Sequence, residues 1–278
     1  MSATERQWTR LACRVLAPNP GPMTLEGTNS YIIRHPYSSE VVIVDPGPWE
    51  RRHMRSLTSS GRVELILLTH SHADHSESAE RLARRTGAPV RSRNPRLCVN
   101  ALPLGDGEVI EVAGTRIDVV ATPGHTADSV CFVLPDDTRD GQHDGGASWA
   151  DRGRGSVLTG DTILGRGTSV IASPDGSLGD YLASLERLVR LGPRTLLPGH
   201  GPLLENSGAA AGEYLDHRKA RLDEVAAAVV RLRGPAGPGA VSVAEVADLI
   251  YPDVSPELRH AAESSVAAQL SYLAGSAS

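Results

Sequence analysis

The stretch LILLTHSHADHSESAERL, residues 65–82, runs from an apolar segment directly into three histidines and an aspartate within six positions. The apolar part, with turn signals before it, predicts a buried strand. After the cluster, Ala79, Leu82 and Ala83 fall on one helical face, and Gly87 stands where a helix C-cap belongs. The cluster therefore lies at a strand end, where a chain either exposes polar side chains or builds a metal site.

Composition narrows the class of protein. The chain has 278 residues, 40% of them hydrophobic and 22% charged, with a formal net charge of −5. These values predict a soluble globular chain and give no basic footprint for duplex DNA. The three cysteines lack C-x-x-C spacing, and no apolar run approaches the roughly 18 residues of a membrane helix. We therefore expect no membrane partner and a reducing, cytoplasmic location.

Strands and helices are expected to be mixed along most of the chain, which predicts an α/β fold. Strands are predicted at 30–35, 40–45, 62–69, 108–112, 115–121, 129–134, 156–161 and 194–201, and helices at 50–59, after the histidine cluster, and from 177 to the Gly192-Pro193 stop. Residues 136–155 predict a surface loop. From about 207 onward only helices are expected: 210–233, a linker at 234–239, and helices opening at 242 and 255. We divide the chain into domains 1–208 and 209–278.

Further potential ligands stand at other predicted strand ends. His70 and His72 alternate along an extended segment and can grip one cation from one side. Asp74 and His75 are adjacent and can diverge toward a second cation. The remaining members of the set are His125, Asp161 and His200. Five imidazoles and two carboxylates suit two zinc ions, with manganese or iron as alternatives. A single histidine of this kind would be interpreted as a surface residue. The combined set at several strand ends instead indicates a metal site.

The segments THSHADH, TPGHTADS, LTGDT and PGHG, in this order, resemble the metallo-β-lactamase superfamily over residues 19–206. The resemblance implies an αββα sandwich. It also implies that His70, His72 and His125 hold the first metal. Asp74, His75 and His200 would hold the second, with Asp161 bridging the two ions. True metallo-β-lactamases place Cys or Ser where this chain has Asp161.

Finer motifs resemble the β-lactamase-like endoribonuclease family, which includes thioesterase cousins in polyketide pathways. They are NPGPMTLEGTNSYII (19–33), GDTILGRGTSV (160–170), PGHGPLLEN and YLDHRKAR (214–221). The resemblance implies a winged-helix-like C-terminal domain. Two features depart from it: no two-stranded wing is visible, and residues 241–278 carry Arg259 against five acidic residues. Such a tail is a poor partner for phosphates, so we expect it to pack on the core or on a second subunit in a homo-oligomer.

Three functions follow as hypotheses. The first is a dizinc endoribonuclease that attacks single-stranded RNA with a metal-bridging hydroxide. The alternative is a hydrolase of thioesters or other small-molecule esters, and the third is a non-catalytic nucleic-acid-binding module. In an enzyme, Asp74 would orient the hydroxide and His217 could act as general acid, although a lone histidine is more often a packing or surface residue. Asn29 and Thr168 are predicted substrate contacts. Thr24 and Ser30 are weighed beside them, and a turn role is favoured for Ser30.

Overall fold

The computed structural model describes residues 5–137, 155–171, 175–233 and 241–276. The N-terminal part forms a six-stranded sheet with the order β1-β2-β3-β4-β5-β6. Its strands are β1 (Glu5–Gln7), β2 (Ala12–Leu16), β3 (Asn29–Ile33), β4 (Glu40–Val44), β5 (Arg62–Leu67) and β6 (Val90–Arg91). Strands β4, β5 and β6 run parallel, so their carboxyl ends meet at one edge of the sheet.

A second sheet has five strands in the order β11-β10-β9-β8-β7. They are β7 (Val109–Val112), β8 (Thr115–Ala121), β9 (Val130–Leu134), β10 (Ser156–Gly160) and β11 (Thr195–Pro198). The last two strands are parallel to each other. Their carboxyl ends therefore also share one edge, and both precede predicted ligands.

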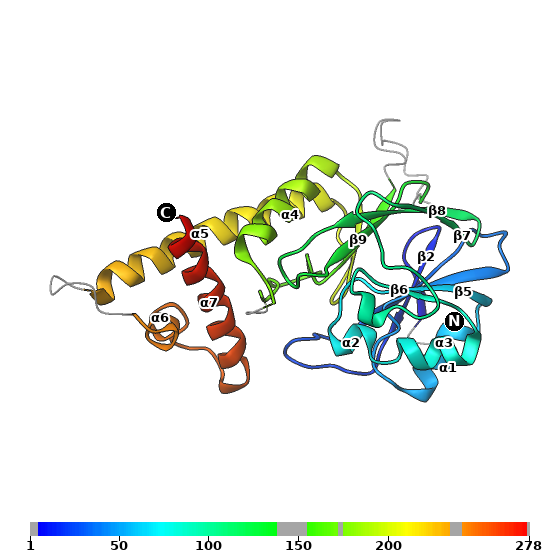
Figure 1. Cartoon of the computed structure of the whole chain (residues 1–278), viewed down its shortest axis with the longest axis horizontal. Coiled ribbons are helices and arrows are strands. Elements are labelled where there is room, and N and C mark those ends of the chain that lie inside the picture. The colour runs from blue at the N-terminus through cyan, green and yellow to red at the C-terminus, as the bar shows by residue number, and fades with distance from the viewer. Residues whose placement is uncertain (1–4, 138–154, 172–174, 234–240, 277–278) are drawn as a thin grey trace.

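Helices cover the outer faces of the two sheets, and an apolar core lies between the sheets (Figure 1). Helices α1 (Arg51–Thr58) and α3 (Ala79–Thr86) pack on the first sheet through Met54, Leu57 and Leu82. Helices α4 (Leu178–Leu191) and α5 (Ser207–Arg233) cover the second sheet. The predicted αββα sandwich is confirmed.

Local signals set most helix ends. Glu50 caps α1 by accepting from the His53 backbone N–H, and Gly87 ends α3 in the left-handed conformation. Ser177 caps α4 in the same way as Glu50 caps α1. Sequence reasoning did not find β1, β2, β6, the four-residue α2 (Ala73–Ser76) or the 3-10 turn η1 (Pro95–Leu97). Most of these elements have two to four residues, too few for a hydrophobic period, and the five residues of β2 show no regular alternation of burial.

Beyond β11 the structure describes three helices. They are α5, α6 (Val243–Ile250), which opens with the predicted Ser242–Glu245 capping box, and α7 (Arg259–Ser276). The third predicted helix opens as a 3-10 turn, η2 (Pro256–Leu258), before α7. We call α6, η2 and α7 the helical arm. No strand lies among described residues 207–233 and 241–276, so a winged-helix character remains unconfirmed.

Helix α5 joins the arm to the sandwich. Its first half packs with α4 and the second sheet through Ala211 and Tyr214, while Val225 and Ala228 belong to the arm's own apolar cluster. The predicted domain boundary at 208 thus falls inside the first turn of α5. Most of the predicted loop at 136–155 and the linker at 234–239 lie outside the described residues. None of the described helices has the length and apolarity needed to cross a bilayer.

Candidate metal centre

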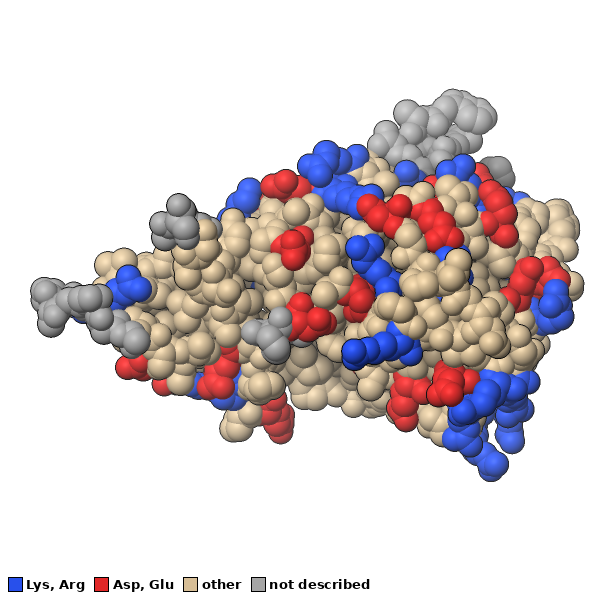
Figure 2. All heavy atoms as spheres, in the orientation of Figure 1, with Lys and Arg blue, Asp and Glu red and all other residues tan. Residues whose placement is uncertain are grey.

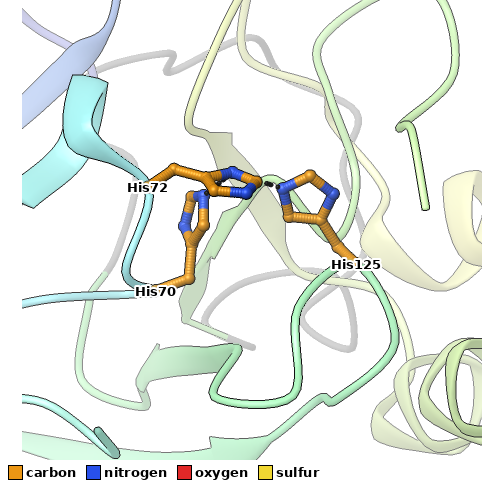
Figure 3. Close-up of side chains that lie close together, drawn as sticks. All are labelled: His70, His72 and His125. Carbon is orange, nitrogen blue, oxygen red and sulfur yellow. Dashed lines mark hydrogen bonds between the residues drawn. The ribbon is translucent and has the colours of Figure 1, made fainter. Parts of the chain in front are cut away.

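Three of the predicted ligands meet at the sheet edges, from two loops (Figure 3). His70 and His72 follow β5, and His125 lies between β8 and β9. His72 Nδ1 is 3.0 Å from His70 Nε2 and 3.1 Å from His125 Nε2. Three imidazole nitrogens therefore surround one point.

A second group lies beside the first. Asp74 and His75 come from α2, and His200 follows β11. His200 Nε2 is 3.2 Å from His75 Nε2 and 3.1 Å from Asp74 Oδ2. Asp161, at the end of β10, has carboxylate oxygens 3.4 Å from His75 Nε2, 3.5 Å from His200 Nε2 and 3.8 Å from His125 Nε2. The structure thus brings all seven predicted ligands together, with Asp161 between the two groups.

The outward ring nitrogens fix the orientation of the imidazoles. His75 Nδ1 donates to Asp45 Oδ2 at 2.9 Å, and His200 Nδ1 donates to the Gly27 carbonyl at 3.2 Å. His125 Nδ1 donates to the carbonyl of Val170. Each outward N–H leaves the lone pair of Nε2 directed inward, as it is in histidines that ligate metals.

The donor set fits cations. Neutral imidazoles that point lone pairs at each other from 3.0 Å repel unless a cation or a proton lies between them. Asp161 Oδ1 is buried and has no hydrogen-bond partner. Gly199 leaves room at this point, because a Cβ there would clash with Asp161 Oδ1 and with the His75 ring. Nitrogen and carboxylate ligands in two such groups match the preferences of zinc and neighbouring transition metals.

The charges of the site are strongly coupled. Burial lowers the pKa of His70 and of His125, which favours their neutral, ligating forms. Burial also opposes charge on His200, but the carboxylates of Asp161 and Asp74 raise its pKa to about 9. Burial opposes the charge of Asp161 as well, yet His200 and His75 hold its pKa well below the ordinary value. The Asp161 and Asp74 carboxylates therefore favour positive charge between the two ligand groups, carried by protons or by metal ions.

Sequence reasoning missed the residues behind the ligands. Asp45 accepts from His75 Nδ1 and, at 2.6 Å, from the Thr69 hydroxyl, whose oxygen in turn lies 3.0 Å from His70 Nδ1. Asp45 has a positive φ of 49°, which is uncommon for a non-glycine residue. The signal in the sequence was an aspartate directly after the apolar run VVIV, similar to Asp161, which follows the apolar pair Val157-Leu158 after two further residues.

The polar residues predicted in the segment before and at the start of β3 make hydrogen bonds within the fold. Asn29 is fully buried, and its side-chain amide donates to the carbonyls of Pro198 and Gly201 at 3.0 and 2.9 Å. Asn29 therefore holds the His200 loop, and its contact with a substrate stays a prediction. Ser30 is buried against His53, and Thr24 donates to the Asn19 carbonyl, as expected of structural residues.

Thr168 and His217 share a cavity with two of the candidate ligands. Both are exposed and line a cavity of about 350 Å³ that His125 and Asp161 also line. On its other side the cavity is bounded by residues of α5 and of the helical arm. Their roles in substrate binding and acid catalysis stay predictions.

Comparison with known proteins agrees with the fold and the site. The family described as the metallo-beta-lactamase superfamily matches residues 23–139. Lactamase-like protein adaB of Aspergillus niger is 30% identical over 270 residues, which cover 92% of this chain and 77% of the relative. An atrochrysone carboxyl ACP thioesterase of Aspergillus fumigatus is 31% identical over 255 residues, covering 86% of this chain and 72% of the relative.

Among solved structures, a metallo-beta-lactamase family protein from Thermus thermophilus superposes with a TM-score of 0.71 at 25% identity, covering 95% of this chain and 93% of that one. A beta-lactamase domain protein from Burkholderia ambifaria shares the fold, with a TM-score of 0.73 at 19% identity, covering 99% of this chain and 90% of that one. The similarity extends through the helical arm in both cases. This chain therefore belongs to the metallo-β-lactamase superfamily, and it is a hydrolase of that superfamily.

Proposed function

We propose that the chain is a dinuclear metal-dependent hydrolase of acyl thioesters. The observation that carries the proposal is the cavity beside the candidate metal centre, which has an apolar wall contributed by the helical arm. Such a wall suits an acyl group better than a polyanion. The name of the Aspergillus fumigatus relative, an ACP thioesterase, supports the same choice.

Two metal ions would be held by the seven residues of the centre. His70, His72 and His125 would bind one ion, Asp74, His75 and His200 the other, and Asp161 both. When bound, such ions act as Lewis acids toward a carbonyl oxygen and lower the pKa of water to about 7. Zinc fits this donor set, and manganese or iron also accept it.

Thioester hydrolysis needs few catalytic groups besides the metal ions. Hydrolysis joins a water oxygen to the thioester carbonyl carbon and breaks the C–S bond, whose electron pair leaves with the sulfur. One proton of the water ends on the thiolate after it has left, and the acid product releases the other to solvent. Asp74, with a side chain 30% exposed, can accept a hydrogen bond from the attacking water and orient it. A thiol has a pKa of about 8.5, so its thiolate leaves without a proton donor. The exposed His217 is therefore not required for this reaction.

Single-stranded RNA, the first hypothesis from the sequence, is the second candidate. Three arginines line the cavity and could meet phosphates. Arg166 and Arg221 are each paired with a glutamate, which leaves Arg218 as the one of the three without an ion pair among the described residues. Figure 2 shows basic and acidic side chains interspersed on the visible face, with arginines gathered mainly over α1 and α3. One unpaired arginine is a poor match for a strand that carries a phosphate at every nucleotide, so the distribution of charge favours the thioester.

The deciding experiment offers the metal-loaded protein three substrate classes in parallel. They are acyl-N-acetylcysteamine thioesters, the matching oxygen esters, and labelled single-stranded RNA. We expect hydrolysis of thioesters that is abolished by chelation and restored by zinc. Metal-dependent RNA cleavage without thioester hydrolysis would overturn the proposal in favour of the ribonuclease.

A further inference from the structure

The cavity beside the metal centre contains a buried cation that forms no ion pair with a carboxylate of the described residues. Arg218, on α5, is 3% exposed and lines the cavity. One of its N–H groups, on Nη2, donates to the carbonyl of Ser169, and its guanidinium lies 5.2 Å from the centre of the Tyr181 ring. Its Nε is buried without a hydrogen-bond partner.

The other two arginines of this cavity differ in this respect. Arg166 Nη1 pairs with Glu26 at 2.5 Å, and Arg221 Nη1 pairs with Glu224 at 2.6 Å. Within the described part of the chain, no ion pair involves Arg218. Burying an unpaired charge is unfavourable, and a guanidinium offers five donors. Arg218 therefore has the charge and the free donor capacity to bind an anion.

The surroundings of Arg218 indicate how an anion would arrive. Apolar side chains also line the cavity. They are Leu164 from the sandwich and Val254, Leu258 and Ala262 from the helical arm. An apolar chain can lie against these side chains while its reacting carbonyl faces the metal centre. A carboxylate at the end of such a chain would then reach Arg218, which contacts the segment beside the metal centre through Ser169.

We propose that Arg218 binds a carboxylate on the acyl group, so that the preferred substrates are thioesters of an apolar chain ending in an acid. This inference rests on the proposed thioesterase function and adds the class of acyl group. The helical arm supplies the wall that holds the chain, and Arg218 selects its end. The bond from Arg218 to Ser169 also fixes the segment that precedes Val170, whose carbonyl accepts from His125.

Binding can be measured without hydrolysis. In thioether analogues of glutaryl- and pentanoyl-N-acetylcysteamine, CH₂ replaces the thioester carbonyl, so that they differ from each other in the carboxylate. Titration calorimetry on the metal-loaded protein should give about 10- to 100-fold tighter binding of the acid-bearing analogue, the range expected for a charged hydrogen bond. Equal affinities of the wild-type protein for the two analogues would overturn the proposal.

Variants assign the preference to a residue. Arg218→Met should remove the preference for the acid while leaving the affinity for the neutral analogue within about threefold, and Arg218→Lys should keep part of it. Arg166→Met, which removes a cation that already has a carboxylate partner, should retain the preference. Metal content and thermal unfolding establish that each variant is folded. If Arg218→Met and Arg218→Lys weaken both analogues equally, Arg218 only supports the Ser169 segment and the proposal fails.

Two further outcomes are distinct. If 4′-phosphopantetheine alone binds in an Arg218-dependent manner, the cation belongs to the thiol arm of the substrate and the acyl assignment is wrong. If thioesters are not hydrolysed, but the acid-bearing analogue still binds through Arg218, the proposed reaction fails while the anion site stands. Loss of hydrolysis and loss of selectivity are therefore separate results.

Discussion

The metal centre and the helical arm meet at one cavity but are built in opposite ways. At the centre, hydrogen bonds between polar side chains fix the ligands: Asp45 accepts hydrogen bonds from His75 and from the Thr69 hydroxyl. Where α5 packs on the arm, Val225 of α5 joins Val246 and Val266 of the arm in an apolar cluster. The first arrangement fixes atoms for a reaction, and the second shapes a surface. The comparison separates the chemistry of the protein from its choice of substrate.

Asp161→Ala should have the largest effect, because the Asp161 carboxylate faces both groups of candidate ligands. Losing a metal removes several kcal/mol of transition-state stabilisation, so we expect activity to fall by roughly 10³-fold, and metal content to fall with it. Elemental analysis and initial rates check this. Asp118→Ala, on the surface beside Arg116, is the matched control. Two firmly bound ions in Asp161→Ala would refute the bridging role.

Asp45→Asn should lower metal affinity by about 10- to 100-fold, the usual cost of losing a partner behind a ligand. The amide keeps the shape but weakens the acceptor for His75 and Thr69. Competition with a chelator measures the affinity of each ion. If affinity is unchanged, the polar network behind the ligands is less important than its geometry indicates, and the contrast with the arm weakens.

Val266→Ala tests the apolar side of the comparison. Val266 is fully buried between the helices of the arm, so its truncation should lower the free energy of unfolding by about 2 kcal/mol. Because α5 belongs to both apolar clusters, we expect one cooperative transition in urea. The control is Val230→Ala, at a residue 74% exposed, which should change stability little. Two separate transitions would show that arm and sandwich fold independently.

His217→Ala should have the smallest effect. Thiolates leave without an acid, so thioester hydrolysis should change less than about threefold, whereas an acid in RNA cleavage would be worth about 10²- to 10⁴-fold. Rates on both substrates give the answer, with exposed His260→Ala in the arm as the control. A large loss on thioesters with unchanged metal content would place His217 in the reaction.

Much of the fold could be predicted because its signals are local. Apolar runs predicted the strands other than β1, β2 and β6, and caps such as Glu50, Gly87 and Ser177 lie at or next to the predicted helix ends. The ligands were found because each follows a strand closely. The short α2 could not be predicted, since four residues carry no period.

The rest of the site depends on contacts between distant residues. Asn29 was placed in a loop by its polar neighbours, but it begins β3 and bonds to residues 198 and 201. Arg218 stands in the charged run HRKAR, which resembles a solvated helix face. Its burial follows from packing against Ser169 and Tyr181, which the sequence of α5 does not show.

The continuity of α5 also restricts how the chain can change in length. Arg218 faces the sandwich while Val225, seven residues later, faces the arm, and the helix between them sets the rotational phase of the two parts. Deleting one residue there would turn the arm by about 100° around the axis and carry Leu258 away from the cavity. An insertion of seven residues, close to two full turns, would preserve the phase but move the arm by about 10 Å. Homologues that differ in the length of this helix should therefore differ by near-multiples of a turn, and each step should lengthen the cavity.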